Sequence, residues 1–334
     1  MAKGLDVGTS FIVLSQENND GSISYTDFRD AFYIIKPTTP VATKMIEKGL
    51  AGKVFIKDSD GSFILLGKDA IEKAIERNEN AKRPMFRGVV SAKEKDAKKI
   101  LAFILKEVVG KSSESGEKLV FCVPAQPVDQ EDNDFDIGYH EDVIETILGD
   151  CGYDVKSINE AEALAYAELG DNDYTGVAVS CGAGMTNVCV MLNGEPTVVF
   201  STTKSGDWID RMSAIATGEK DSVVQAEKEN GVFEIGQPND NPVLSAVSSY
   251  YERLIDYTTK HLSIALSNHK SLPKFKDSLD VVVAGGTSLA KGYVETFHNK
   301  LKENGFPIPI RQVKHAADPL HAVSKGCLIA AKVL

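Results

Sequence analysis

The chain has 334 residues, of which 43% are hydrophobic and 25% charged, so it is long enough for two domains with separate cores. Its formal net charge of −11 argues against general binding to nucleic acids or to anionic membranes, because both select for Lys and Arg. No apolar run approaches the roughly 20 residues that span a bilayer, and a strand is predicted directly after Met1, so we expect neither a signal peptide nor a direct membrane anchor.

The first glycine turn joins two strands near the start of the chain. Residues 3–7 form one extended run and residues 11–14 begin the next, with Gly8, Thr9 and Ser10 between them. Residues 18–22 then turn the chain into a third strand that ends near residue 28. Gly8 allows the backbone to approach an anion closely, and the two hydroxyls add donors. Alone, such a turn could equally be an ordinary hairpin loop.

Residues 29–150 are expected to alternate between strands and helices. Residues 32–37, 53–57 and 63–67 are predicted strands, and residues 68–78 a helix. An amphipathic helix is predicted over 91–109, with a solvated lysine face. A buried strand follows at 119–124. The acidic residues 129–134 lack the spacing of a calcium loop, so we expect a polar loop there, before a helix around 140–148.

The second half repeats the strand, glycine turn and strand. After a strand at 154–158 and an alanine-rich helix from Glu160, residues 177–192 form two strands around Gly182, Ala183, Gly184, Met185 and Thr186. Residues 213–275 are mainly helical, with a long helix over 243–267. A third apolar strand, 281–284, runs into Gly285, Gly286, Thr287 and Ser288, where a flat base and ribose could rest on bare backbone. The last helix is expected over 319–334.

The five cysteines are odd in number and scattered, and no two have metal-ligand spacing. They lie mostly in apolar strand or helix patterns, so we expect buried thiols in a reducing cytoplasm. They are Cys122, Cys151, Cys181, Cys189 and Cys327.

The three turns, in this order and at this spacing, resemble the two phosphate motifs and the adenosine motif of the actin-like ATPase superfamily. This superfamily includes actin, the MreB and MamK filament proteins, the heat-shock chaperones and the sugar kinases. The resemblance covers nearly the whole chain and implies an α/β fold of two lobes. Each lobe would be a mixed sheet flanked by helices, with the nucleotide cleft between them.

The resemblance also implies four subdomains. Residues 1–28, 89–173 and 311–334 would form subdomain IA, and residues 29–88 subdomain IB. Residues 174–212 and 276–310 would form subdomain IIA, and residues 213–275 subdomain IIB. In this scheme the helix that begins at Glu160 crosses between the halves and acts as their hinge.

The resemblance assigns ATP or ADP and Mg²⁺ to the cleft. Asp6 would hold Mg²⁺ through water, although it could instead cap its own turn. Glu160 would orient the water that attacks the γ-phosphate, or simply complement the helix dipole. Gly206 would approach ribose or phosphate, whereas the neighbouring Asp207 could cap a helix. The phosphate donors would come from Gly8, Thr9, Ser10, Gly182, Ala183, Gly184, Met185 and Thr186, and the adenosine contacts from Gly285, Gly286, Thr287 and Ser288.

Four positions depart from the family pattern. Glu227 and Lys228 lie where related filament proteins place a Lys-Glu pair near adenine, but in reversed order, and could equally be surface charge. Ser180 replaces the usual Asp at the start of the second phosphate turn, and Asn187 replaces its closing acid. Because neither brings a charge to the magnesium neighbourhood, we expect nucleotide binding to be kept and hydrolysis to be slow.

The resemblance implies a cytoplasmic, ATP-binding cytoskeletal protein that assembles with itself into filaments and works with adaptor proteins that the sequence does not identify. One alternative is a non-polymerising ATPase switch, such as a chaperone-like reactivase or an assembly adaptor. Another is a sugar or acetate kinase, although we find no clear equivalent of the catalytic Asp of those enzymes.

Overall fold

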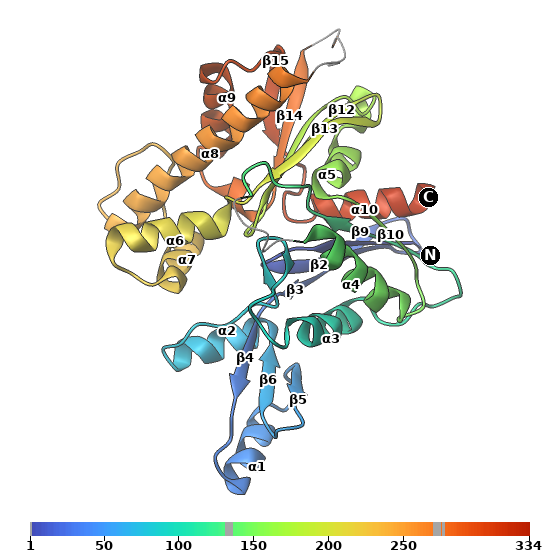
Figure 1. Cartoon of the computed structure of the whole chain (residues 1–334), viewed down its shortest axis with the longest axis vertical. Coiled ribbons are helices and arrows are strands. Elements are labelled where there is room, and N and C mark those ends of the chain that lie inside the picture. The colour runs from blue at the N-terminus through green and yellow to red at the C-terminus, as the bar shows by residue number, and fades with distance from the viewer. Residues whose placement is uncertain (1, 131–135, 270–274, 276–277) are drawn as a thin grey trace.

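A computed structural model describes residues 2–130, 136–269, 275 and 278–334 of the chain. It shows two lobes and a projecting arm (Figure 1). The acidic segment at 129–134 lies mostly outside the described residues, so only its first two members can be compared with the prediction. Among the described residues, no helix is long and apolar enough to cross a bilayer.

Lobe I is built on a five-stranded sheet of order β10-β9-β1-β2-β3. Strands β1, β2 and β3 form an antiparallel meander. Strands β9 and β10 extend the sheet in parallel on the other side of β1. Their bounds are Lys3–Val7 (β1), Phe11–Glu17 (β2), Ile23–Arg29 (β3), Lys118–Val123 (β9) and Asp154–Asn159 (β10).

Lobe II repeats this plan with a sheet of order β13-β12-β11-β14-β15. Again an antiparallel meander is extended by two parallel strands, here on the far side of β11. The bounds are Gly176–Cys181 (β11), Thr186–Leu192 (β12), Glu195–Thr202 (β13), Leu279–Ala284 (β14) and Ile310–His315 (β15). Because β1 and β11 occupy the same place in the two sheets, the turns that follow them occupy equivalent places in the two lobes.

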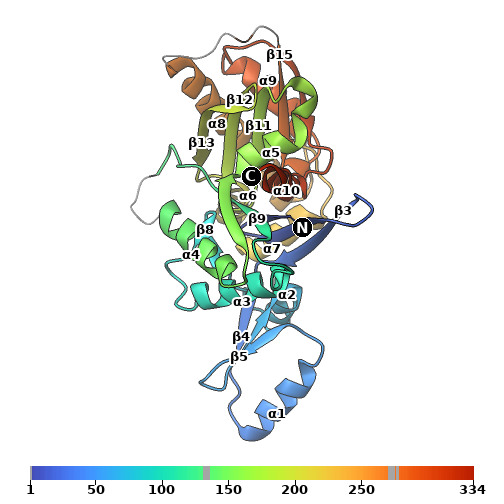
Figure 2. The ribbon, with the colours of Figure 1, turned by 90° about the vertical axis from the view of Figure 1, so that its right-hand side faces the viewer.

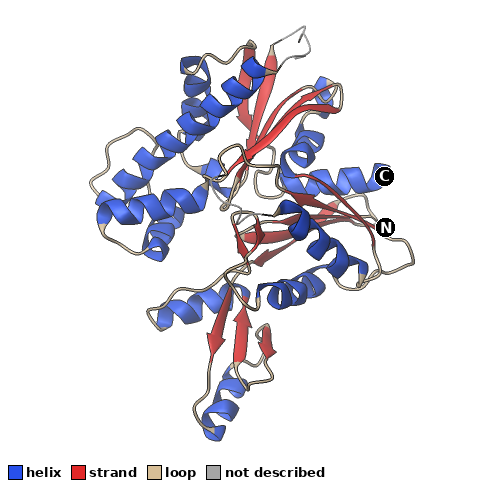
Figure 3. Cartoon of the chain, in the orientation of Figure 1, coloured by secondary structure: helices blue, strands red, loops and turns tan. Residues whose placement is uncertain are grey.

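Helices cover both sheets (Figure 3). Lobe I carries α3 (Ala97–Val109) and α4 (Ile137–Gly149), and α5 (Glu160–Glu168) and α10 (Ala322–Val333) lie between the sheets. Lobe II carries α6 (Gly206–Thr217), α7 (Asp221–Asn230), α8 (Pro242–Asn268) and α9 (Tyr293–Glu303). Short 3₁₀ turns occur at Gly170–Asn172 and Gly286–Leu289. All five cysteines are buried free thiols, as predicted.

Two predicted helix starts were too early. Helix α3 begins at Ala97 and not at residue 91, because its buried face starts there and continues through Ile100, Leu101 and Ile104. Helix α10 begins at Ala322 and not at residue 319, because the carbonyl of Pro319 accepts a hydrogen bond from the backbone N–H of Gly285. The amphipathic pattern therefore located both helices but not their first turns.

The arm projects from lobe I (Figures 1 and 2). It contains a three-stranded sheet of β4 (Phe32–Ile35), β6 (Phe63–Leu66) and β5 (Phe55–Lys57), with α2 (Gly67–Glu76) packed on it. Helix α1 (Pro40–Gly49), which the sequence analysis did not predict, lies at the tip. The chain returns to lobe I through a hairpin of β7 (Met85–Phe86) and β8 (Val89–Val90).

A core of small residues joins the lobes. It is formed mainly by α5 and α10, and includes Ala161, Ala163, Ala178, Ala284 and Cys327. At its tightest point Gly326 of α10 lies against Ala163 of α5, where an added Cβ would meet the Ala163 carbonyl oxygen at 1.8 Å. Only a residue without a side chain allows the two helices to approach this closely.

We predict that Gly326→Ala lowers the free energy of unfolding by about 3 kcal/mol or more, because the new methyl group meets backbone that cannot rotate away. Urea denaturation measures this. Gly149→Ala, at a helical glycine with nothing within 4 Å of the added Cβ, is the control and should change stability by less than about 1 kcal/mol. Equal effects of the two variants would contradict the prediction.

Candidate functional site

A cavity of about 630 Å³ lies between the lobes and is lined by all three glycine turns. This volume is within the range of small-molecule sites in proteins. Fourteen of the predicted residues line it: Asp6, Gly8, Thr9, Ser10, Glu160, Gly182, Ala183, Gly184, Met185, Gly206, Lys228, Gly285, Gly286 and Thr287. The turns predicted from distant parts of the sequence therefore share one cavity.

The first and second turns meet directly. The Thr9 hydroxyl accepts a hydrogen bond of 2.9 Å from the backbone N–H of Gly88. A Cβ added at Gly184 would lie 2.4 Å from the Thr9 Oγ1 atom and 2.7 Å from the Gly88 nitrogen. Glycine at 184 thus allows the two turns to approach across the cleft, with the β7–β8 hairpin beside them.

The third turn packs on the back of the second. Gly285 has a φ of +87°, and an added Cβ would meet the Cys181 carbonyl oxygen at 2.3 Å. The carbonyl of Gly182 accepts hydrogen bonds from the hydroxyls of Thr287 (2.7 Å) and Ser205 (2.6 Å). These bonds fix the second turn relative to the third, whereas Gly286 leaves open space toward the cavity.

Three predicted residues do not line the cavity. Thr186 is buried and donates its hydroxyl to the Lys204 carbonyl, and Ser288 donates to the Gly285 carbonyl. Glu227 accepts a 3.0 Å hydrogen bond from the Asn241 side chain, at the start of α8. Thr186 and Ser288 therefore shape the turns from behind, and Glu227 braces α7 against α8.

Lys228 lies at the cavity wall. Its side chain is only 12% exposed and forms a 2.7 Å ion pair with Asp210 of α6. It also donates to the Gly206 carbonyl at 3.3 Å. The charge that could have been a surface feature of α7 is thus turned inward, toward the start of α6.

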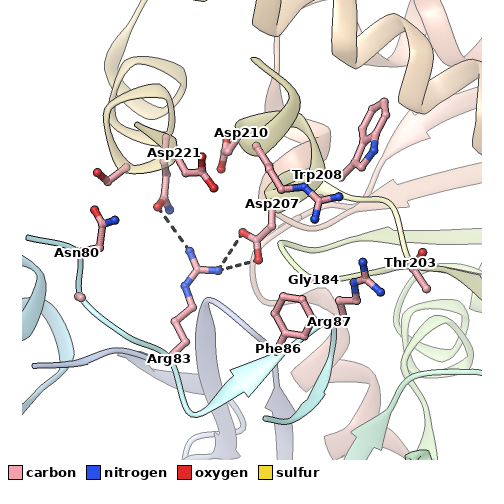
Figure 4. Close-up of a pocket in the computed structure, with 14 residues that line it drawn as sticks. Asn80, Arg83, Phe86, Arg87, Gly184, Thr203, Asp207, Trp208, Asp210 and Asp221 are labelled. Carbon is pink, nitrogen blue, oxygen red and sulfur yellow. Dashed lines mark hydrogen bonds and ion pairs between the residues drawn. The ribbon is translucent and has the colours of Figure 1, made fainter. Parts of the chain in front are cut away.

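Asp207 neither caps α6 nor stands free in the cleft. Its two oxygens accept hydrogen bonds of 2.9 and 2.8 Å from the guanidinium of Arg83, which enters from the segment before β7 (Figure 4). Arg83 also reaches Gln225 of α7, at 3.5 Å. A second pair, Arg29 with Glu229 at 3.3 Å, crosses between the lobes beside it. Sequence analysis missed both pairs, because their members are 124 and 200 residues apart.

The carboxylate of Glu160 is held by Ser180 and Asn187. The Ser180 hydroxyl donates to one of its oxygens at 2.6 Å, and the Asn187 amide donates to the other at 2.8 Å. The Asn187 carbonyl oxygen in turn accepts from the Ala125 N–H at 2.9 Å, which fixes which side of the amide faces Glu160. Two uncharged donors thus orient this acid.

Glu160 and Asp6 form a partly buried acidic pair at the wall of the cavity. Loss of hydration and the nearby charge of Asp6 raise the pKa of Glu160, and loss of hydration raises the pKa of Asp6. The thiol of Cys122 donates to an Asp6 oxygen at 3.2 Å. Two neighbouring carboxylates in one cavity form a site that a divalent cation would stabilise.

These residues fit Mg²⁺ bound with a nucleotide. Mg²⁺ usually takes one or two carboxylates, several waters and phosphate oxygens, rather than a cage of protein ligands. The described part of the chain contains no cluster of three or more His, Cys, Asp or Glu side chains that could hold a metal alone. Asp6 is the carboxylate at the end of β1 that would hold the ion.

A family model for volactin matches residues 1–331 of this sequence. The chain belongs to the volactin family. No curated protein matches the sequence. Among solved structures, this volactin-family chain is similar to the "MamK double helical filament", with 19% identity, a TM-score of 0.74, and 99% of this chain and 98% of that chain covered.

Two further structures are similar to the volactin-family chain. One is MreB 5 of Spiroplasma citri bound to AMPPNP, with 14% identity, a TM-score of 0.68 and coverage of 99% of this chain and 96% of that chain. The other is the ethanolamine utilization protein EutJ from Carboxydothermus hydrogenoformans, with 17% identity, a TM-score of 0.54 and coverage of 98% and 89%. These likenesses confirm the predicted two-lobed, actin-like α/β fold.

We predict that Asn187→Asp destabilises the protein increasingly as pH rises. At low pH one carboxyl of the new pair keeps a proton and can replace the lost N–H donor to Glu160. The pKa of the pair is then raised above its unfolded value, so stability is lost as pH rises from about 5 to 8. We expect urea denaturation to show an extra loss of about 2 kcal/mol or more at pH 8 relative to wild type.

Asn241→Asp is the matched control, because Asn241 also donates its amide to a glutamate, Glu227, and accepts backbone N–H bonds with its oxygen. It is only partly buried, so solvent screens the new charge and the pH-dependent loss should stay below about 1 kcal/mol. If the two variants respond alike to pH, the buried contact with Glu160 is not the cause.

Proposed function

We propose that this chain binds ATP with Mg²⁺ between its lobes and polymerises into cytoskeletal filaments. One observation carries the proposal: three glycine turns and two partly buried carboxylates line a single cavity. The similarity to a MamK filament and to MreB 5 bound to AMPPNP supports both parts. We place this activity in the cytoplasm.

In the proposed complex the two facing turns hold the phosphates. Gly8, Thr9 and Ser10 belong to the lobe I turn, and Gly182 to Met185 belong to the lobe II turn. Backbone N–H groups and small hydroxyls would supply the donors. The purine would lie over Gly285 and Gly286, where nothing but Leu320, at 3.8 Å, is near an added Cβ at position 286. Thr186 and Ser288 would act by holding the turns in shape.

Asp6 would hold Mg²⁺ through water, and the ion would neutralise phosphate charge. Glu160 would accept a proton from, and orient, the attacking water. Its carboxylate is already fixed by Ser180 and Asn187, so it offers the remaining lone pairs on its two oxygens. Because both fixing residues are uncharged, the cavity holds fewer carboxylates than the family pattern provides, and we expect slow hydrolysis.

In the proposed function, the lobes move relative to each other, and the four-subdomain division indicates which parts move. Residues 29–88 and 213–275 would be the outer parts, and the Arg29–Glu229 pair joins them across the cleft. The Arg83–Asp207 pair joins residues 29–88 to the proposed subdomain IIA. The small-residue core of α5 and α10 would be the hinge. A nucleotide that bridges the lobes would favour the closed arrangement, and this would set the strength of contacts between subunits.

We predict that the purified protein sediments with ATP and Mg²⁺, and that electron microscopy of the pellet shows filaments. Gly286→Val should weaken ATP binding at least 10-fold, because the new side chain fills the space proposed for the purine. The melting temperature should not change, and sedimentation should be abolished. Gly49→Val, at an open glycine on the arm, is the control for nucleotide binding. ATP binding without filaments would favour the non-polymerising switch, and the absence of ATP binding would refute both.

We also predict that Ser180→Asp speeds phosphate release with Mg²⁺ and ATP, because it restores a carboxylate beside Glu160 where the ion can neutralise it. A coupled phosphate assay measures the rate. Ser180→Ala is the control, since it removes the hydroxyl without adding charge. The slow-hydrolysis hypothesis would be wrong if wild type hydrolyses ATP quickly and Ser180→Asp leaves the rate unchanged.

A further inference from the structure

A second hollow lies between the lobes, beside the β7–β8 hairpin. It has a volume of about 470 Å³ and opens onto a smaller hollow of about 310 Å³, with which it shares Phe86, Arg87, Thr203, Trp208 and Arg211. We call the larger hollow the cationic groove. Figure 4 shows the smaller hollow, with Phe86 and Arg87 of lobe I on one side and Trp208 of lobe II on the other.

Four cationic side chains line the cationic groove. Arg87 and Lys93 come from lobe I, and Lys204 and Arg211 from lobe II. Within the described part of the chain, none of the four forms an ion pair with a carboxylate. This concentration of positive charge stands out in a protein whose net charge is −11. A concave surface of one sign attracts and concentrates ions of the other.

Aromatic rings position three of these cations without neutralising them. The Lys204 Nζ atom lies 3.7 Å from the ring centre of Tyr257 and 5.5 Å from that of Trp208. On the other wall, Arg87 and Lys93 lie 5.2 and 5.3 Å from the ring centre of Phe86. Cation–π contacts remove part of the hydration of a cation while leaving its charge available. The groove is therefore arranged before any anion arrives.

Among the described residues that line the groove, Asp129 is the one carboxylate, and it is already hydrogen-bonded. Asp129 accepts hydrogen bonds from the backbone N–H and the hydroxyl of Thr203, at 2.8 and 3.1 Å. It also accepts a 2.9 Å bond from the hydroxyl of Tyr257. Asp129 thus ties β13 and α8 to lobe I at the rim, and within the described lining four cations face one acid that is already engaged.

We propose that the cationic groove binds a small polyphosphate anion, inorganic or carried by an organic molecule. Arg87 and Arg211 offer planar forks that match phosphoryl oxygens, and the two lysines offer compact charges. A phosphoryl group carries about 1.5 to 2 negative charges near neutral pH, so two such groups roughly balance four cations beside the single charge of Asp129, within a volume of about 470 Å³. Because both lobes contribute cations, the anion bridges them.

The groove adjoins the glycine turns. An added Cβ at Gly184 would lie 3.0 Å from the Cα atom of Arg87, and one at Gly88 would lie 3.0 Å from the Met185 sulfur. The segment that carries Arg87 therefore touches the second turn directly. An anion held there stiffens the hairpin that supports the cavity between the lobes, so the groove is suited to an effector.

The chain contains a single tryptophan, Trp208, and it lines this groove but not the cavity between the glycine turns. Its fluorescence thus reports on the groove. We predict that inorganic pyrophosphate, added without Mg²⁺, changes this fluorescence saturably, and that the same affinity appears in isothermal titration calorimetry. Lys204→Gln combined with Arg211→Gln should weaken the affinity at least 10-fold, and Lys93→Gln alone several-fold.

Lys98→Gln combined with Lys302→Gln removes the same charge from exposed helix surfaces and should weaken binding less than 2-fold. Excess ADP should leave pyrophosphate binding in place. Loss of binding with ADP would mean that pyrophosphate occupies the cleft between the glycine turns, and undiminished binding by the groove variant would mean that it binds elsewhere. Either result, or no binding by calorimetry, overturns the proposal without affecting the proposed ATP site.

Discussion

The fold depends on a single close contact between helices. Helices α5 and α10 lie between two sheets of identical plan, and Gly326 allows them to touch backbone to backbone at Ala163. Any larger residue would separate the helices and change the angle between the sheets. Since each sheet carries one phosphate turn at the same structural position, the distance between the turns is set here, far from the turns themselves.

The cleft combines opposite electrostatic demands. It partly buries two acids, whose pKa values are raised mainly by loss of hydration, and it places glycine turns beside them. Ser180 and Asn187 donate hydrogen bonds to Glu160 and add no charge of their own.

Local features of the sequence were sufficient to predict the turns, but not which side chains contact one another or face the cavity. Each glycine turn lies within a few consecutive residues, and the alternation of strands around it is visible directly. The inward direction of Lys228 depends on Asp210, and the role of Asp207 depends on Arg83, both of which lie outside any local window. For the same reason Thr186, Ser288 and Glu227, which occupy the expected positions, point away from the cavity.

Helix α1 was missed for a different reason. Its signals are local, since Thr39 accepts the N–H of Ala42 and Pro40 occupies the first turn, but the helix is short and buries no residue. By contrast, the long helix α8 was predicted to within one residue at each end, because a buried stripe runs along its whole length. A buried face along the helix was thus a better guide to predicting it from the sequence than its capping residues were.

The order of the chain has a consequence for synthesis. Strand β1 is made long before α10, yet an added Cβ at its Gly4 would meet the Leu328 nitrogen of α10 at 2.2 Å, and Ser15 of β2 donates its hydroxyl to the Ser324 carbonyl. Lobe I therefore stays open on that face until the ribosome has passed through all of lobe II. A growing chain must keep this apolar face covered by other means, so lobe II becomes a complete folding unit before lobe I does.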